Sequence, residues 1–256
     1  MDLFNHLNLS TDCQLCGCSV EPRKKTDNNS DGSFLPPSPL ICHYCHQRLP
    51  ISYNNCFVCG LPLHKVLYGH SAHQQQKLDT PCGECLKNSP IFDRTVSAFH
   101  YENPVNRLIS QLKYSSQLHV LPLLCEYLIS EIIEQYRASP LPSLIIPTPL
   151  HANKLTKRGF NQSYLISKQI TKALAIKIAA SGIKRVKDTQ AQSGLDSIER
   201  KSNVKNAFRI NQELPKHVAL VDDVVTTGTT ISELAKQAKK RGAKKIDVWC
   251  LARAYE

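Results

Sequence analysis

Regular spacing of apolar residues begins at about residue 91 and continues to the end of the chain. Val105, Leu108, Ile109 and Leu112 lie three or four positions apart, so they would share one face of a helix. Short apolar runs such as 218–221 are typical of buried strands. The pattern predicts helices over 105–114, 121–136, 160–178 and 229–241, and strands over 95–100, 144–146, 218–221 and 246–251. Because strands alternate with helices, we expect an α/β domain with a mostly parallel sheet flanked by helices.

Residues 1–90 lack such periodicity. They are interrupted by Gly, Pro, Asn and Ser, and the segments 27–39 and 69–77 are expected to be irregular loops. A segment of this kind buries too little apolar surface to fold without a cross-link. We therefore expect a small cysteine-rich region over 1–90 and an α/β domain over 91–256.

Eight of the 11 cysteines fall in C-x-x-C pairs. A C-x-x-C turn directs two sulfurs at one metal ion, and two such turns complete a tetrahedron. Gly17 and Gly60 follow their pairs closely, as tight knuckle turns require. Since four thiolates leave no open coordination position, the pattern predicts two structural zinc ions in a double zinc ribbon. The expected ligands are Cys13, Cys16, Cys42, Cys45, Cys56, Cys59, Cys82 and Cys85.

Several alternatives exist for the cysteines. The simplest pairing joins the first pair with the second and the third with the fourth, but an interleaved arrangement is also compatible with the sequence. Cys18 is an alternative to Cys16. Redox-active pairs usually occur singly at a helix start, and disulfides are rare in a reducing compartment. Cys125 and Cys250 stand among apolar residues and are expected in the core. Nearby histidines, His43, His46 and His64, are expected to be ordinary surface residues.

The formal net charge of +11 lies entirely in residues 91–256, because residues 1–90 hold equal numbers of acidic and basic side chains. Such a surface attracts polyanions, either phosphate groups or nucleic acid, although a solvated basic face is the plainer explanation. No apolar run reaches the length of a membrane span, and residues 1–10 do not resemble a signal peptide. We therefore expect a cytoplasmic protein.

The most specific motif is LVDDVVTTGTT over 220–230. An apolar strand brings Asp222 and Asp223 to the carboxyl edge of the sheet, where ligands bind in open α/β folds. Adjacent carboxylates can accept hydrogen bonds from vicinal ribose hydroxyls. The next residues offer a phosphate backbone N–H groups, hydroxyls and a helix start, and Gly228 permits close approach. The candidate ligand-binding residues are Asp222, Asp223, Thr226, Thr227, Gly228, Thr229 and Thr230.

A second polar segment, IPTPLH over 146–151, follows the strand at 144–146. Thr148 lies within it, and Lys154, Lys157 and Arg158 come next as cations suited to a pyrophosphate. A solvated basic loop is the alternative. RGFNQ over 158–162 follows at once, and its Asn161 is suited to open the next helix.

The segment 220–230 resembles the signature of the type I phosphoribosyltransferases, in which two aliphatic residues and two acids precede a loop rich in hydroxyls and glycine. The resemblance implies that Asp222 and Asp223 hold the ribose hydroxyls of phosphoribosyl pyrophosphate, which binds with Mg²⁺. It implies that residues 226–230 surround the 5′-phosphate, and that the loop with Thr148 meets the pyrophosphate.

The whole set of motifs is similar to the ComF family and covers nearly the entire chain. Beside the segments above, it includes LKY (112–114), QSGL (192–195), Glu199-Arg200 and Asn203. The resemblance implies a double zinc ribbon followed by a type I phosphoribosyltransferase fold. It further implies a role in natural competence, with single-stranded external DNA and DNA-uptake proteins as partners.

Two other functions are compatible with the sequence. One is an active phosphoribosyltransferase that acts on a nucleobase or an amine, and the other is a zinc-ribbon interaction module on a catalytically inactive fold. The segment 186–208 is a candidate to close over the site or to contact a nucleic-acid backbone, since it carries Lys187, Arg200, Lys201 and Lys205.

Overall fold

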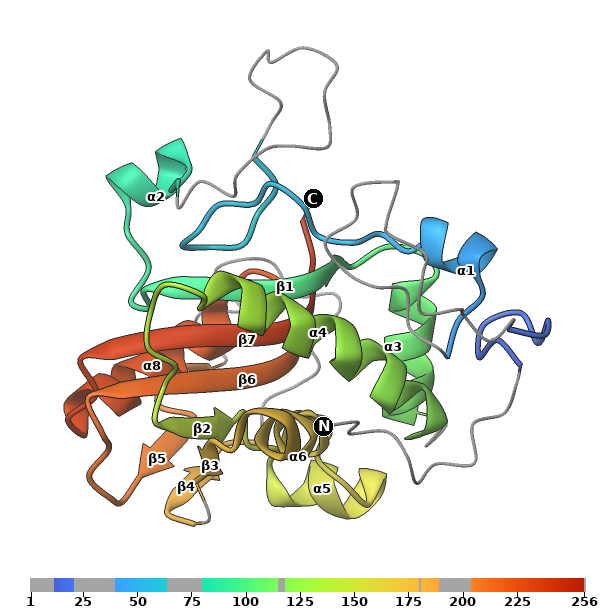
Figure 1. Cartoon of the computed structure of the whole chain (residues 1–256). Coiled ribbons are helices and arrows are strands. Elements are labelled where there is room, and N and C mark those ends of the chain that lie inside the picture. Colours follow the sequence, from blue (N-terminus) through green and yellow to red (C-terminus); the bar gives the residue numbers. More distant parts are fainter. Residues whose placement is uncertain are drawn as a thin grey trace.

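A five-stranded parallel sheet forms the centre of the computed structural model, which describes residues 12–20, 40–63, 80–114, 118–179, 181–188 and 204–255 (Figure 1). Its strand order is β1-β7-β6-β2-β3, and every neighbouring pair runs parallel. The expected α/β class is thereby confirmed. The strands are β1 (Arg94–His100), β2 (Leu144–Pro147), β3 (Lys177–Ile178), β6 (His217–Val225) and β7 (Lys245–Arg253).

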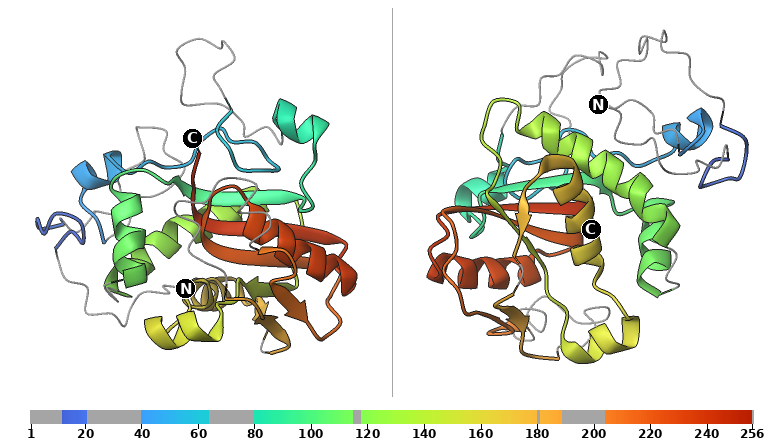
Figure 2. Two further views of the ribbon diagram at one scale, coloured as in Figure 1. Left: turned by 180° about the vertical axis from the view of Figure 1, so that it is seen from behind. Right: turned by 60° about the horizontal axis from the view of Figure 1, so that its bottom comes forward.

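Helices cover both faces of the sheet. Residues of α3 (Val105–Tyr114), α4 (Leu121–Gln135) and α6 (Gln162–Leu174) pack with Ala219 and Val221 of β6. Residues of α8 (Thr229–Lys240) pack with Val218 and Leu220 on the opposite face. Figure 1 shows α4 and α6 in front of the sheet, and the left view of Figure 2, seen from behind, shows the red-orange helix α8 on the opposite face. Because β6 is buried on both sides, its apolar run is continuous rather than alternating.

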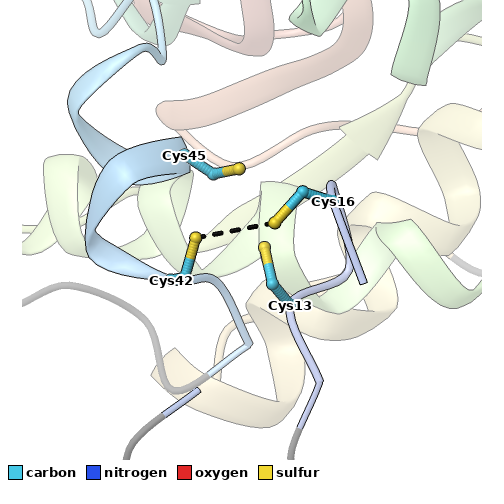
Figure 3. A group of neighbouring side chains, drawn as sticks. All are labelled: Cys13, Cys16, Cys42 and Cys45. Atoms are coloured by element: carbon cyan, nitrogen blue, oxygen red, sulfur yellow. Dashed lines mark hydrogen bonds between the residues drawn. The ribbon is translucent and has the colours of Figure 1, made fainter. Parts of the chain in front are cut away.

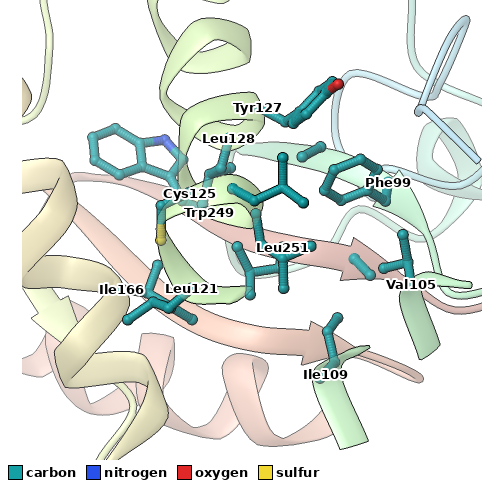
Figure 4. Close-up of a cluster of buried hydrophobic side chains, with 14 of the residues drawn as sticks. Phe99, Val105, Ile109, Leu121, Cys125, Tyr127, Leu128, Ile166, Trp249 and Leu251 are labelled. Carbon is teal, nitrogen blue, oxygen red and sulfur yellow. The ribbon is translucent and has the colours of Figure 1, made fainter. Parts of the chain in front are cut away.

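The larger core includes Trp249 of β7, whose side chain is completely buried (Figure 4). Leu128 of α4 and Ile166 of α6 belong to the same cluster. Cys125 lies in this core and Cys250 in the core on the other face, as predicted. Two free thiols are therefore ordinary packing residues, unlike the paired cysteines.

Several element boundaries differ from the prediction. The helix expected over 160–178 ends at Leu174, because Ala175 adopts a left-handed conformation with φ of 55° and its N–H bonds to the carbonyl of Thr171. The next residues form β3, which pairs with β2. β6 continues past Val221 to Val225, because the ladder to β7 runs through both acidic residues of the motif.

The remaining described elements are short. α5 (Ala152–Arg158) buries no residue, so it lacks the apolar spacing that reveals helices in a sequence. β4 (Ile183–Arg185) and β5 (Phe208–Ile210) form a separate antiparallel pair. The 3₁₀ turn η1 (Leu118–Val120) leads into α4, and the cysteine-rich region holds α1 (His43–Gln47) and α2 (Gly83–Lys87).

The cysteine-rich region covers the open edge of β1. The N–H of Ser52 bonds to the carbonyl of Ala98 at 2.9 Å, and the N–H of His100 bonds to the carbonyl of Pro50 at 2.8 Å. Further along the edge, the N–H of Thr95 bonds to the carbonyl of Phe57 at 3.0 Å. Unpaired strand edges invite association with other chains, and this edge is instead occupied by the chain itself.

Some expectations fall outside the described residues. These are the irregular loops at 27–39 and 69–77, His64, the motif residues 192–195, 199, 200 and 203, and Lys201. Within the described ranges, no helix is both long and apolar enough to cross a membrane.

Candidate functional site

The acidic pair lies near the carboxyl end of β6, in the middle of the sheet. Asp223 is buried and forms an ion pair with Lys113 of α3, whose Nζ lies 3.1 Å from Asp223 Oδ1. Asp222 is partly buried and accepts a hydrogen bond from the hydroxyl of Ser163 at 3.0 Å. Both side chains are thus fixed by helices on one face of the sheet.

Burial and crowding change the proton affinity of these groups. Burial raises the pKa of Asp222 to about 6, and the neighbouring carboxylate of Asp223 acts in the same direction. Lys113 and Ser163 oppose the shift without cancelling it. Burial alone would lower the pKa of Lys113, but the attraction of Asp223 and Asp222 outweighs it and raises that pKa. The site therefore holds two carboxylates beside one firmly protonated ammonium group.

The loop after β6 is a tight turn that presents hydroxyl groups. Thr226 and Thr227 are exposed, and Gly228 caps α8 with a left-handed φ of 74°. The Oγ1 atoms of Thr227 and Thr229 lie 2.7 Å apart, so one donates a hydrogen bond to the other. The turn brings the predicted residues 226–230 together at the start of a helix, where the positive end of the helix dipole favours an anion.

The second polar segment lies beside β6. The N–H of Thr148 bonds to the carbonyl of Val221 at 2.8 Å, which anchors the loop next to the acidic pair. Thr148 Oγ1 is buried and has no hydrogen-bond partner among the described residues. The side chain of Asn161 donates to the carbonyl of Thr148 at 3.0 Å and accepts from the N–H of Tyr164, so Asn161 opens α6 as predicted.

The cations Lys154, Lys157 and Arg158 lie on α5, which meets the β4–β5 pair. Asn153 Nδ2 donates to Asp188 Oδ2 at 2.7 Å and links α5 to the chain after β4. Burial lowers the pKa of Lys154, and the nearby charges of Arg185 and Arg158 lower it further. Arg185 on β4 also lies within electrostatic range of Asp222. Lys154 therefore lies within electrostatic range of Arg158 and Arg185, and Arg185 in turn lies near the acidic pair.

The paired cysteines form two groups of four sulfurs, and within each group the sulfurs lie within 4.8 Å of one another. The first cluster joins the first pair to the second (Figure 3), and the second cluster joins the third pair to the fourth, as the simplest pairing predicts. Cys18 is exposed and outside the first cluster. The members are Cys13, Cys16, Cys42 and Cys45 in the first cluster, and Cys56, Cys59, Cys82 and Cys85 in the second.

The geometry of both clusters fits tetrahedral zinc. Zinc–sulfur bonds of about 2.3 Å give sulfur–sulfur edges of about 3.8 Å in a regular tetrahedron. The observed distances are 3.7 Å between Cys16 and Cys42 and 3.8 Å between Cys59 and Cys82. Burial alone would raise the pKa of Cys56, but N–H groups of Cys59 and Cys82 point at its sulfur and lower the pKa to about 7. Such N–H groups stabilise a thiolate, the form that binds metal.

One histidine differs from the prediction. His43 is exposed as expected, but His46 is buried, and its Nδ1 lies 2.5 Å from the hydroxyl of Tyr127 on α4. The rings of His46 and Tyr127 also stack. His46 therefore attaches the first cluster to the main core. The sequence shows only a histidine beside a cysteine pair and gives no sign of this contact.

Known proteins resemble this chain over most of its length. It is 38% identical to competence protein F of Haemophilus influenzae over 221 residues, which cover 83% of this chain and 96% of that protein. The chain belongs to the ComF family. Another relative, the DNA utilization protein YhgH of Escherichia coli K12, is 35% identical over 218 residues and is covered over 90% of its length. Competence protein ComFC of Bacillus subtilis is 20% identical over 82% of each chain.

Two further comparisons concern family models and solved structures. No family model matches the chain. A purine phosphoribosyltransferase from Pyrococcus horikoshii is 23% identical, covers 52% of this chain and 72% of its own length, and has a TM-score of 0.33. The α/β class of this ComF protein rests on the strand order and helix layers described above.

Some site residues were not singled out in the sequence. Lys113 and Ser163 contact the acidic pair, and Arg185 lies near it. Lys113 comes directly after Leu112, the last residue on the apolar face of α3. The apolar spacing alone therefore predicts that Lys113 faces solvent. The only sequence signal for Lys113 was its place in the LKY segment that this chain shares with the ComF family.

Proposed function

We propose that this ComF-family protein binds phosphoribosyl pyrophosphate together with Mg²⁺ at the carboxyl edge of its sheet, and that it acts in the cytoplasm on external single-stranded DNA. One observation carries the ligand proposal. Asp222, Asp223 and the hydroxyl turn follow one another at the carboxyl end of β6, and α5 with its cations follows the neighbouring parallel strand β2 at the same end of the sheet. Each of these three parts matches one part of the ligand.

The acidic pair suits the ribose. Each carboxylate has roughly four acceptor positions. Ser163 and Lys113 occupy only part of this capacity, and they also hold the oxygens in place. Vicinal hydroxyls would donate to the remaining lone pairs, and Mg²⁺ prefers the same hard oxygen ligands.

The hydroxyl turn suits the 5′-phosphate, and the cations suit the pyrophosphate. The turn offers threonine hydroxyls and the N-terminal N–H groups of α8 to an anion. Lys154, Lys157 and Arg158 would face the more highly charged end of the ligand, beside the buried hydroxyl of Thr148. We also assign one structural zinc ion to each cysteine cluster, because the sulfur spacing fits it.

Calorimetric titration of the zinc-loaded protein with phosphoribosyl pyrophosphate and Mg²⁺ tests the ligand proposal. Because hydrogen bonds to charged groups contribute about 1.5–3 kcal/mol each, Asp222→Ala with Asp223→Ala should weaken binding by about 100-fold or more. Asp93→Ala is the matched control, since that carboxylate bonds to the N–H of Ile246 at the opposite edge of the sheet. Binding that is equally strong in the double variant, or absent from the wild type, would contradict the proposal.

The DNA part of the proposal rests on the names of the relatives and on the charge of the α/β domain. Competence protein F and the DNA utilization protein are the relatives concerned. If the cations of α5 contact a DNA backbone, affinity for a single-stranded oligonucleotide should fall with salt, with a slope of about −0.7 for each phosphate neutralised. Fluorescence anisotropy of wild type and Lys157→Ala measures this slope, and Lys240→Ala at the end of α8 is the control. An affinity that does not depend on salt would contradict DNA binding.

Catalytic turnover is a second candidate, which the raised pKa of Asp222 favours. A carboxyl group with a pKa of about 6 can accept a proton near neutral pH, as transfer to an amine or a nucleobase would require. Pyrophosphate release in the presence of a panel of nucleobases and amines tests this candidate. Release by the wild type but not by Asp222→Asn would support it, and no release with any acceptor would argue against it.

A further inference from the structure

Arg253, the last residue of β7, has a buried side chain with an unusual set of partners. Its Nε donates to the carbonyl of Cys59 at 2.8 Å, and its Nη1 donates to the carbonyl of Val225 at 2.9 Å. The same Nη1 donates to the carbonyl of Thr226 and, at 2.6 Å, to that of Ala254. Only 5% of the residue is exposed. A charge at this depth is tolerated because several carbonyl oxygens replace the water that it has lost.

These partners belong to two different parts of the molecule. Cys59 is a member of the second cysteine cluster, whereas Val225 and Thr226 lead into the hydroxyl turn. Figure 1 shows the end of β7 rising to the segment of residues 50–63, coloured cyan. One guanidinium group therefore connects the second cluster to the first residues of the candidate phosphate loop.

The second cluster is seated tightly on the sheet at this place. Thr95 Oγ1 donates to the carbonyl of Val58 at 2.7 Å. A Cβ atom added to Gly60 would lie 2.7 Å from Cγ2 of Thr95, closer than real side chains approach. The turn of Cys56–Gly60 thus has little room to move, so the carbonyl of Cys59 is a fixed point for Arg253.

Electrostatics favour the same connection when metal is bound. Zn²⁺ with four thiolates carries a net charge of about −2. The sulfurs of Cys59, Cys85 and Cys56 lie within electrostatic range of the Arg253 guanidinium. A bound ion would also tie Cys59 to Cys56, Cys82 and Cys85, and would therefore add a second restraint on the position of the Cys59 carbonyl.

We propose that the second cysteine cluster positions the phosphate loop through Arg253, so that zinc at this cluster is required for tight binding of phosphoribosyl pyrophosphate. Arg253 is a positioning residue, because its hydrogen bonds go to backbone carbonyls, including those of Val225 and Thr226 at the start of the loop. This inference rests on the proposed function only for the identity of the ligand. The mechanical connection between cluster and loop can be tested without any ligand.

The test compares two buried arginines of the zinc-loaded full-length protein. Arg253→Gln removes the connection to the loop. Arg94→Gln is the matched control. Arg94 is also 5% exposed, and it contacts the ring of Phe57 next to the second cluster. It is the first residue of β1, at the end of the sheet away from the phosphate loop, and its guanidinium lies between the rings of Phe57 and Tyr136. Amide hydrogen exchange of residues 225–231 is measured without ligand, together with zinc content and ligand affinity.

We expect Arg253→Gln to keep its zinc, to speed exchange at 225–231 by at least about 10-fold, and to weaken ligand binding by a similar factor, because the loop loses its charged hydrogen bonds at Val225 and Thr226. Arg94→Gln should lower the melting temperature without changing either property. Wild-type exchange and affinity in Arg253→Gln, or equal changes in both variants, would overturn the proposal.

A second pair of variants covers the case in which Arg253→Gln fails to fold. Cys82→Ser at the second cluster should reproduce the faster exchange at 225–231, and Cys16→Ser at the first cluster should not. Faster exchange in both variants, or in neither, would overturn the proposal. If the wild type fails to bind phosphoribosyl pyrophosphate, the proposed function is wrong, and the exchange data still decide whether the cluster holds the loop.

Discussion

The two cysteine clusters have the same ligand set but are attached to different parts of the molecule. Cys13 and Cys45 of the first cluster are packed into the large core with Phe99 and Tyr127. The second cluster forms a small apolar cluster of its own. Its connections are hydrogen bonds to the edge of β1 and to Arg253. The first cluster therefore supports the core, whereas the second is attached to the outer strand β1 and, through Arg253, to the start of the candidate phosphate loop.

The difference shows that a metal-binding motif specifies its own geometry but not its role. Both clusters contain C-x-x-C turns with a glycine after one pair. Their roles are set by residues far away in the sequence, Tyr127 for the first cluster and Arg253 for the second. Variants that affect one cluster at a time can separate these roles.

The largest effect on stability is expected from loss of the zinc ion assigned to the first cluster. Cys13→Ser with Cys16→Ser should lower the stability of the zinc-loaded protein by several kcal/mol, because zinc binding supplies folding free energy and these residues lie against the main core. Thermal unfolding measures the change. Cys18→Ser, an exposed cysteine outside the cluster, is the control and should melt like the wild type. Equal melting of all three proteins would show that the first cluster does not support the core.

Loss of the zinc ion assigned to the second cluster should reduce stability less than loss of the first, and should reduce ligand affinity more. In Cys56→Ser with Cys59→Ser, we expect phosphoribosyl pyrophosphate to bind at least about 10-fold more weakly, because the loop loses its anchor. Calorimetry below the melting temperature measures the affinity in both cluster variants. The comparison fails if the first-cluster variant loses more affinity than the second-cluster variant.

Asp222→Asn separates stability from binding at the site itself. The folded protein holds the pKa of Asp222 at about 6, above the ordinary value of 3.8, so stability is lost as pH rises through this range and the buried carboxyl ionises. Asparagine does not ionise, so the variant should become the more stable protein by about 1–3 kcal/mol at pH 7.5, with a smaller advantage at pH 5.5. Unfolding by urea at both pH values measures this. A variant that is less stable than the wild type at pH 7.5 would contradict the inference that the ionised carboxylate of Asp222 destabilises the folded protein.

The smallest effect is expected at the contact between the first cluster and α4. Tyr127→Phe removes the hydrogen bond to His46 and should cost about 1 kcal/mol of stability, with no change in ligand affinity. Urea unfolding and calorimetry on the same preparation check both statements. A marked loss of ligand affinity would mean that the first cluster also communicates with the site.

Local patterns made much of this structure predictable. The helix at 105–114 has the predicted bounds, because its apolar face is regular. The cysteine pairs associate in the simplest order, since sequence neighbours reach one another without crossing the sheet. The hydroxyl turn and the acidic pair lie together because one strand, one turn and one helix follow in direct succession.

Contacts between distant residues were not predictable. Lys113, Ser163 and Arg253 reach their partners across the sheet from other elements, and each is individually typical of a surface or core position in the sequence. α5 gave no signal because all of its side chains remain accessible. The end of α6 was misplaced because Ile178 of β3 continues the four-residue spacing of Ile170 and Leu174 in the sequence, although Ala175 turns the chain after Leu174.

Hydrogen exchange of the zinc-loaded wild type, with and without phosphoribosyl pyrophosphate and Mg²⁺, tests most directly whether the hydroxyl turn binds the ligand. We expect slower exchange of the amides in residues 226–231, where the loop would surround the 5′-phosphate. We expect little change at the amino ends of β6 and β7. Exchange that is unchanged throughout 226–231 at a saturating ligand concentration would contradict the central claim that this turn binds the ligand.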